Sequence, residues 1–331
     1  MVKKVFKIIF KTLLIVLAVF AFLIIGLNAF KHPFYSKYYN VKEDVAYNQG
    51  LGDGFVSQGV AKVIVDGHEY YFTSGYMSNG EASRVYINNN KTYYYVNIKL
   101  SDYELSYDHF GGITATKDNI YLTGEKAIYE IPITDFAQDP VDKPVKSLGS
   151  KTSVKAVKVK NSYEVDVQTS YIYADPTDTY LYVGEFNYGP YKTNHETSVN
   201  FGNETYYAYV NCYLISRLGK EDALQYRFAV RDKVQGFAIA DGKIVLSTSY
   251  SVPSSTLYVY NIPQDFDKDN IYYLDNRYLS YSLKAPSMME ALDYCPEKKQ
   301  FITLFESACN KYFFGKFFLA NKIVGLTLWL N

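Results

Sequence analysis

The stretch GFVSQGVAKVIVDGHEYYFTSGYMSNGEASR, at residues 54–84, reads as a short apolar strand, an Asp-Gly turn and a second strand. An Asp-Gly pair between two such runs is typical of a β-hairpin. The same plan returns in degenerate form in four further places: residues 109–131, 169–186, 234–260 and 289–308. A hairpin that recurs along the chain indicates a repeat architecture.

The period of this repeat predicts the fold. When the copies are aligned on Gly59, Gly112, Ser170, Gly236 and Ala291, they are separated by 53, 58, 66 and 55 residues. Strand-only repeats of roughly 40–55 residues are typical of propeller blades. We therefore expect an all-β chain with a five-bladed β-propeller over residues 54–331. A six-bladed ring is the alternative. The longer spacings coincide with loop-like insertions at residues 135–153 and 188–205.

Each unit has room for four strands. In the first, the pattern predicts strands at residues 60–65, 69–74, 84–88 and 93–100. The fifth unit is short, with strands expected only at residues 291–294, 301–306 and 322–330. A closed propeller can take its missing outer strand from the other end of the chain, and residues 41–47 are the candidate. Only single helical turns are expected after residue 53, within residues 132–140 and 217–228.

The composition agrees with this fold class. The chain of 331 residues contains 36 Tyr and 21 Phe but only 4 Met and 1 Trp. Tyrosine suits half-buried pleated surfaces, so this excess favours β-structure. The formal net charge is zero, and no basic stripe runs through the repeats. Nucleic acid is therefore not an expected partner.

The N-terminal segment predicts a membrane anchor. Residues 13–30 (LLIVLAVFAFLIIGLNAF) are apolar except for Asn28. Eighteen helical residues measure about 27 Å, close to the hydrocarbon thickness of a bilayer. Residues 1–12 carry four lysines and no acid, so the positive-inside rule places this tail in the cytoplasm and the propeller outside it. A cleaved signal peptide is the alternative. Residues 31–53 are expected to form a juxtamembrane linker that includes the closing strand.

Two readings of the cysteines stay open. Cys295 and Cys309 flank one expected hairpin and would bridge if its register places them opposite each other. A pair of free, buried thiols is the other reading, and Cys212 is expected to be free in both. No histidine spacing predicts a metal site, and no motif identifies a cofactor.

Several repeat phrases carry a likeness to a known group of proteins: SQGVA (57–61), TSGYM (73–77), SRVYI (83–87), HFGGI (109–113), YVGEF (182–186), QGFAI (235–239), STSY (247–250) and LFESA (304–308). With these phrases the chain resembles bacterial extracytoplasmic five-bladed β-propeller proteins, many of them uncharacterised. The resemblance covers most of residues 54–320 and implies a fold and a location but no reaction. A weaker likeness, to arabinanase-type propellers, concerns architecture alone.

Candidate site residues recur at the strand ends that should meet at the propeller axis. The opening pairs supply Gln58, His109, Ser170, Gln235 and Glu290, and the ends of the second strands supply Tyr76, Glu185, Tyr250 and Glu306. The carboxylates Glu185, Glu290 and Glu306 are the candidates for acid–base chemistry. The candidates for ligand binding are Gln58, Tyr76, His109, Gln235 and Tyr250. In the alternative, structural interpretation, these groups bind one another, the backbone and water.

These features lead to three hypotheses of function. The first is a membrane-anchored extracytoplasmic propeller that binds a ligand or partner, with a carbohydrate, a peptide or an envelope protein as the candidates. The second is a glycoside hydrolase-like enzyme acting on extracellular polysaccharide with carboxylates at the channel mouth. The third is a scaffold subunit of an envelope complex. No complete catalytic signature occurs in the sequence, which favours the first.

Overall fold

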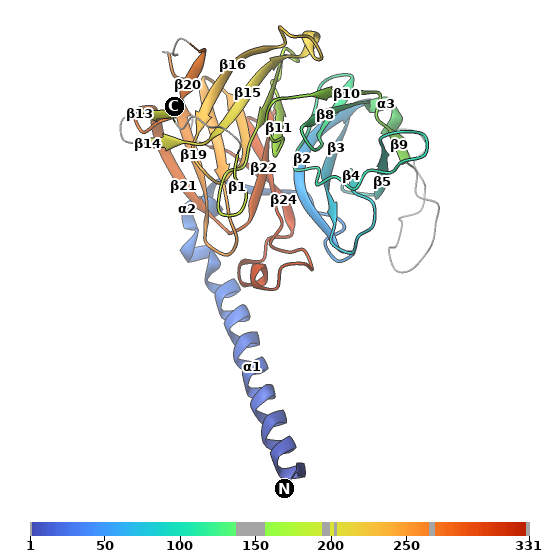
Figure 1. Ribbon diagram of the computed structural model, residues 1–331. Helices are drawn as coiled ribbons and strands as arrows, with labels where there is room; N and C mark the ends of the chain where they lie inside the picture. The colour runs from blue at the N-terminus through green and yellow to red at the C-terminus, as the bar shows by residue number, and fades with distance from the viewer. Residues whose placement is uncertain (1, 137–155, 194–198, 202–203, 265–268, 329–331) are drawn as a thin grey trace.

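The structure, a computed structural model, describes residues 2–136, 156–193, 199–201, 204–264 and 269–328. A single long helix, α1 (Val2–Phe34), projects from a domain built of strands (Figure 1). It is long and apolar enough to cross a membrane. A short helix, α2 (Ser36–Val41), follows it and leads into the first strand, β1 (Lys42–Tyr47).

All but two of the strands in the described residues belong to five sheets, the blades of a propeller. Blade 1 contains β2 (Phe55–Val65), β3 (His68–Met77), β4 (Arg84–Asn88), β5 (Tyr93–Lys99) and β9 (Ala156–Lys158). Blade 2 contains β6 (Ile113–Ala115), β7 (Asn119–Thr123), β8 (Ala127–Pro132) and β10 (Asn161–Glu164). Blade 3 contains β11 (Tyr171–Ala174), β12 (Tyr180–Gly184), β15 (Ala208–Leu214), β16 (Leu224–Val230) and β20 (Ile271–Tyr273).

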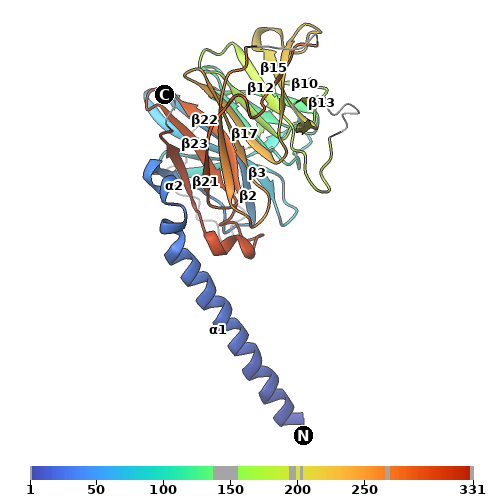
Figure 2. The same cartoon turned by 90° about the vertical axis from the view of Figure 1, so that its left-hand side faces the viewer.

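Blade 4 contains β17 (Val234–Ala240), β18 (Lys243–Thr248), β19 (Ser255–Asn261) and β21 (Leu279–Ala285). Blade 5 contains β22 (Met289–Cys295), β23 (Gln300–Phe305), β24 (Lys322–Leu326) and β1. A separate hairpin joins β13 (Val199–Phe201) to β14 (Glu204–Tyr206). The innermost strands β2, β6, β11, β17 and β22 contact one another in this order, and β22 contacts β2 again. The ring is thus closed with five blades, as the repeat spacing predicts. Figure 2 shows the same domain turned by 90°, with α1 projecting from its base.

The N-terminal strand closes the ring. β1 pairs antiparallel with β24 and supplies the outer strand of blade 5, from Lys42 opposite Leu326 to Tyr47 opposite Lys322. This confirms the closing strand expected at residues 41–47. Joining the first and last strands of the repeat region in one sheet removes the exposed edge that an open propeller would leave.

Two short strands were not expected from the sequence. β9 lies parallel to β5, although it belongs to the segment between the third and fourth strands of blade 2. β20 similarly leaves blade 4 and pairs in parallel with β16 of blade 3. Each is three residues long, too short for a periodicity signal. The expected insertion at 135–153 lies outside the described residues from residue 137 onward.

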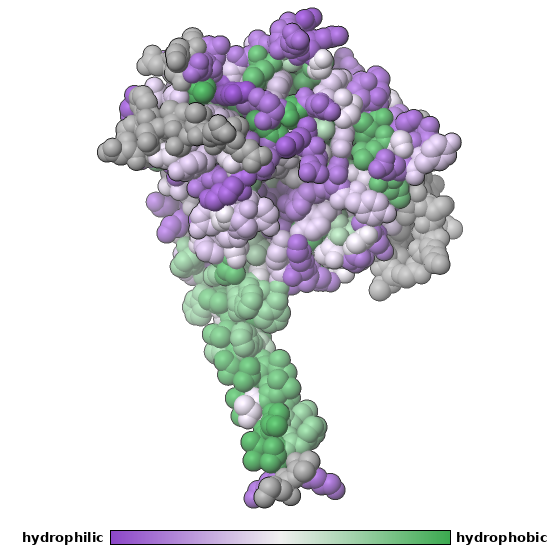
Figure 3. Space-filling view, in the orientation of Figure 1, coloured by the Kyte–Doolittle hydropathy of each residue, from purple (hydrophilic) through white to green (hydrophobic). Residues whose placement is uncertain are grey.

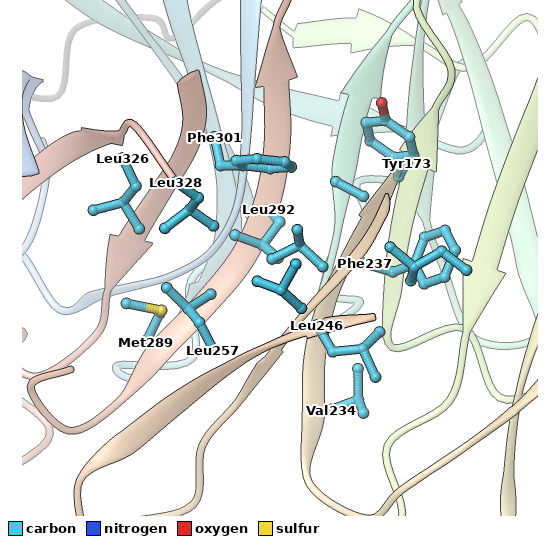
Figure 4. Close-up of a cluster of buried hydrophobic side chains, with 14 of the residues drawn as sticks. Tyr173, Val234, Phe237, Leu246, Leu257, Met289, Leu292, Phe301, Leu326 and Leu328 are labelled. Carbon is cyan, nitrogen blue, oxygen red and sulfur yellow. The ribbon is translucent and has the colours of Figure 1, made fainter. Parts of the chain in front are cut away.

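The core lies between the blades. Figure 4 shows aliphatic and aromatic side chains of blades 3, 4 and 5, among them Phe237 and Leu292, converging on one another. The inner strands approach so closely that Gly59, Gly112 and Gly236 have no space for a side chain. A Cβ on each would lie 2.5–2.6 Å from a backbone nitrogen of the next inner strand. Glycine at these positions therefore sets the spacing of the ring.

The segment before the propeller is largely helical rather than an extended linker. α1 continues beyond the apolar run at residues 13–30 in both directions, and α2 occupies residues 36–41. Tyr38 is buried, with its ring centroid 6.1 Å from that of Phe305 at the end of β23. Packing of α2 against the blade thus fixes how α1 leaves the domain.

The remaining expectations concern short helices and cysteines. The helical turn α3 (Ile133–Phe136) lies inside the expected range 132–140, whereas the 3-10 helix η1 (Ile215–Arg217) ends where the expected range 217–228 begins. All three cysteines are free and buried, so the free-thiol reading of Cys295 and Cys309 holds. The Cys295 thiol lies 3.0 Å from the ammonium of Lys62 instead.

Candidate functional site

A cavity of about 430 Å³ opens at the end of the propeller where the inner strands begin. Eight of the nine residues expected at the axis line it. Its walls include Gln58, Tyr76, His109, Ser170, Gln235, Tyr250, Glu290, Glu306, Lys311 and Tyr312.

 The expected group is therefore brought together at one cavity, and Glu185 is its single absent member.

Irregular strand pairing turns several of these side chains toward the cavity. The register between β2 and β3 shifts at Gln58, and that between β17 and β18 shifts at Gln235. A third shift, between β22 and β23, includes Glu290 and Ala291. A β-bulge places an extra residue on one strand and re-aims its side chain. Gln58, Gln235 and Glu290, the polar residues of their repeat phrases, are thus the residues left unpaired at the bulges.

A chain of hydrogen bonds crosses the cavity wall from blade 2 to blade 5. Gln58 donates from Nε2 to Glu306 Oε2 over 2.8 Å. The other end of the same amide, Oε1, lies 2.9 Å from His109 Nε2. Because the carboxylate fixes Gln58 Nε2 as the donor, Oε1 must accept, and His109 carries its proton on Nε2.

Glu306 is also in hydrogen-bond contact with a second carboxyl group, that of Glu290. Glu290 is only 2% exposed, and burial raises the pKa of its carboxyl well above the usual range, with the charge of Glu306 adding to the effect. Burial also raises the pKa of Glu306, to about 7, against the opposing effects of Gln58 and Lys311. Two carboxyl groups in contact avoid like-charge repulsion by sharing a proton, so Glu290 is neutral near pH 7.

The pKa values of His109 and Lys311, the other two ionisable groups beside Glu306, shift in opposite directions. Burial lowers the pKa of His109 to about 4, with the positive charge of Lys311 adding to the effect, so the imidazole is neutral near pH 7. Burial also acts to lower the pKa of Lys311. Its hydrogen bond to the Tyr76 hydroxyl and the charge of Glu306 outweigh burial, and its pKa is raised. Lys311 therefore stays cationic.

Aromatic rings form much of the cavity rim. The ring centroids of Tyr76 and His109 are 4.1 Å apart, and the Lys311 ammonium lies 4.7 Å from the Tyr76 centroid. On the other side, the rings of Tyr250 and Phe186 stack with centroids 6.2 Å apart. Aromatic faces of this kind offer apolar contact area beside polar groups that fix orientation.

Glu185 is not brought to the cavity. Its carboxylate accepts hydrogen bonds from the backbone amides of Gln168, over 3.2 Å, and Tyr209, over 3.0 Å. The side chain is 1% exposed and ties the end of β12 to β15 within blade 3. The geometry therefore corrects the expectation that Glu185 lies beside the other two carboxylates. Its side chain turns toward its own blade because two amides there need an acceptor.

Some cavity residues have no counterpart in the sequence prediction. Lys311 and Tyr312 come from the connection between β23 and β24, and Tyr191 comes from the long connection after β12. These connections differ from blade to blade, so the repeat gives no signal for them. Phe186 was within reach of sequence reasoning, because it follows Glu185 directly in the repeat phrase YVGEF.

Comparison with known proteins gives a distant structural likeness. The chain matches no known protein family and no curated protein. Hydrazine synthase of Kuenenia stuttgartiensis is 9% identical with a TM-score of 0.39, and the match covers 76% of this chain and 55% of that one. Glutaminyl cyclase of Myxococcus xanthus is 8% identical with a TM-score of 0.39, with 80% and 90% covered. The chain thus spans little more than half the length of the hydrazine synthase chain. The assignment of the propeller rests on the strand pairing described above.

Proposed function

We propose that this protein is a membrane-anchored extracytoplasmic binding module whose central cavity holds a neutral, hydroxyl-rich ligand such as a saccharide unit. Helix α1 would be the anchor, with the lysines at its start on the cytoplasmic side. The proposal rests chiefly on one observation, the buried pair of Glu290 and Glu306 in the cavity wall. One carboxyl oxygen of Glu290 receives no hydrogen bond from the described residues.

The partners of the two carboxyl groups differ. Glu306 accepts a hydrogen bond from the Gln58 amide and a second one from the Tyr312 hydroxyl. The buried Oε1 of Glu290 meets no N–H or O–H donor from the described residues. A buried polar group without enough partners is costly, and a ligand that supplies hydroxyl donors would relieve that cost.

The charge balance of the site favours a neutral ligand. Glu290 and His109 are neutral near pH 7, and the charge of Glu306 is offset by the cation of Lys311. A cavity without net charge gives no general preference for anions or cations. Its carboxyl and amide groups suit hydroxyls, and its aromatic rim suits the apolar face of a sugar ring.

The same geometry speaks against the glycosidase alternative. Hydrolysis of a glycosidic bond requires two carboxyl groups on either side of the bond, about 5–5.5 Å apart for retention and about 6.5–9.5 Å for inversion. Glu290 and Glu306 are in hydrogen-bond contact on one wall of the cavity, which is not the arrangement of two carboxyl groups on either side of a bond. Glu185 does not line the cavity and supplies no second carboxylate.

The proposal is tested by binding measurements on the full chain in detergent or nanodiscs. Neutral oligosaccharides, acidic oligosaccharides and short peptides are compared by ligand-observed NMR and calorimetry. We expect neutral saccharides to bind and Glu290→Leu, which removes both carboxyl oxygens, to weaken binding by about tenfold, the usual effect of losing one hydrogen bond involving a charged or shared-proton group. Glu297→Leu is the matched control, because Glu297 is exposed in the turn at the other end of β22.

Three outcomes would overturn the proposal. The first is preferential binding of peptides or of charged glycans. The second is saccharide binding that Glu290→Leu and Glu297→Leu leave equally intact. The third is absence of binding across the whole panel, which would favour the scaffold hypothesis and would be followed by co-purification from membranes.

A further inference from the structure

An aromatic loop, defined here as residues 311–320 (KYFFGKFFLA), follows β23 and contains the 3-10 helix η2 (Phe314–Phe318). Phe313 and Phe314 are 57% and 56% exposed, although they stand next to each other at the tip of a surface loop. Adjacent exposed phenylalanines are unusual on a water-facing loop and indicate an interaction surface.

The aromatic loop lies along helix α1 rather than against water alone. The ring of Phe313 contacts that of Phe20 with centroids 6.3 Å apart, and the ring of Phe318 stacks on that of Phe34 with centroids 6.2 Å apart. η2 and α1 also lie side by side in Figure 1, where η2 is the red turn at the base of the propeller. The loop therefore follows α1 through the last part of the apolar run.

Polar groups of α1 satisfy the backbone of this loop. Asn28, the single polar residue of the run, donates from Nδ2 to the carbonyls of Lys316 (2.9 Å) and Phe317 (3.2 Å). Its Oδ1 accepts from the amide of Leu319 over 3.2 Å. Lys31 donates to the Leu319 carbonyl over 3.1 Å. An irregular segment at membrane depth needs such partners, because lipid offers none.

The charges of the loop are directed away from its tip. The Lys316 ammonium donates to the carbonyls of Ala308 and, over 2.9 Å, Cys309. The Lys311 ammonium donates to the Tyr76 hydroxyl at the cavity. The part of the loop beside α1 thus presents phenylalanine side chains, and the apolar surface of α1 meets the base of the propeller there (Figure 3). Lysines that turn their ammonium groups back in this way are typical of apolar boundaries.

We infer that the aromatic loop is inserted into the outer leaflet beside α1, with the side chains of Phe313 and Phe314 among the lipids. From Phe20 to Lys31, helix α1 rises about 16 Å, roughly half of a hydrocarbon core of about 30 Å. A loop that contacts α1 as deep as Phe20 enters the membrane wherever α1 spans it. The inference rests on the membrane anchoring proposed above, and it adds a second, loop-based attachment.

This second attachment orients the cavity. Lys311 and Tyr312 line the cavity and directly precede the inserted phenylalanines. On the adjoining blade 4, the hydroxyl of Tyr35 at the end of α1 lies 3.0 Å from that of Ser254, in the connection that also carries the cavity residue Tyr250. The blade 4 and blade 5 side of the cavity mouth is therefore held at the lipid headgroups. A ligand would be met at the membrane surface rather than in bulk solvent.

The test uses the full chain in vesicles of phosphatidylcholine whose acyl chains are brominated at a shallow or a deep position. Bromine quenches tryptophan fluorescence at short range, so a tryptophan probe reports its depth. Trp329→Phe removes the native probe, and single probes are introduced by Phe313→Trp, Phe314→Trp, Leu17→Trp and Lys117→Trp. Leu17 lies inside the apolar run of α1, and Lys117 is exposed in the turn between β6 and β7, at the end of the propeller away from the cavity.

We expect F313W, F314W and L17W to lose emission in brominated vesicles and K117W to keep it. If L17W is quenched while F313W and F314W are not, the inference about the loop is overturned and the anchoring by α1 stands. Absence of quenching in all four proteins would overturn the anchoring itself. Circular dichroism verifies that each variant keeps its β-structure. If a soluble partner rather than lipid covers the loop, F313W and F314W stay unquenched in vesicles of pure lipid, which also rejects the inference.

Discussion

The carboxyl groups of Glu290 and Glu306 touch each other in the wall of the propeller cavity. Glu290 belongs to the irregular start of β22, and Glu306 directly follows the neighbouring strand β23. Antiparallel pairing places the start of one strand beside the end of the next, and the bulge turns the first carboxyl toward the second. The contact makes this site sensitive to pH.

The stability of the protein should therefore change with pH in a way that depends on this pair. The pKa of Glu306 is raised in the fold, to about 7 from the ordinary 4.5, so its protonated form contributes stability that is fully present below about pH 4.5 and is lost as the pH rises through 7. Glu306→Gln mimics the protonated form. We expect the free energy of unfolding of this variant, relative to that of the wild type, to be about 1–3 kcal/mol larger at pH 8 than at pH 5. Denaturant unfolding at both values, followed by circular dichroism, measures this difference. An equal shift at both values would contradict it.

His109 should remain neutral to an unusually low pH. Its pKa is lowered to about 4, chiefly by burial, and its Nε2 proton is donated to Gln58. We expect ¹⁵N NMR to show the Nε2–H tautomer at pH 6 and no titration until the pH approaches 4. Gln58→Leu removes the acceptor and should abolish the tautomer preference. A midpoint for His109 near 6.5 would reject the buried hydrogen-bond chain.

Gly59 should tolerate no side chain. A Cβ there would lie 2.6 Å from the backbone nitrogen of Ile113, on the next inner strand. We expect Gly59→Ala to lower the free energy of unfolding by about 1–3 kcal/mol, the usual cost of overpacking a core. Gly52→Ala is the matched control, because a Cβ at Gly52 meets no atom within 4 Å. Thermal unfolding compares the two, and equal effects would show that the inner strands do not constrain Gly59.

Asn28 should hold the aromatic loop to α1. Asn28→Ala leaves the carbonyls of Lys316 and Phe317 and the amide of Leu319 without this partner. We expect faster hydrogen–deuterium exchange in a peptide covering residues 312–320 in nanodiscs, while the strands of blades 1–4 keep their exchange rates. Phe22→Ala is the control, since Phe22 is 77% exposed on the same helix. Similar exchange in both variants would mean that the loop is held by its own packing.

Much of the fold could be predicted because its signals are local. The Asp-Gly turn after Val65, the alternating strands and the glycines of the opening pairs each report their own backbone geometry. The closing strand was predictable because the fifth unit lacks an outer strand. The short strands β9 and β20 were not, since three residues carry no period and their partners belong to the preceding blade.

The sequence by itself determined the five-fold repeat, the apolar helix and the polar residues that recur at strand ends, because each follows from a pattern within a few residues. The tertiary structure alone decided which of those residues meet. It joined Glu290 to Glu306 through a bulge, turned Glu185 into its own blade, and added Lys311 to the cavity from an unrepeated connection. It also laid the aromatic loop along α1, some 290 residues away in the chain. Contacts between distant segments depend on ring closure and packing, and no local pattern encodes them.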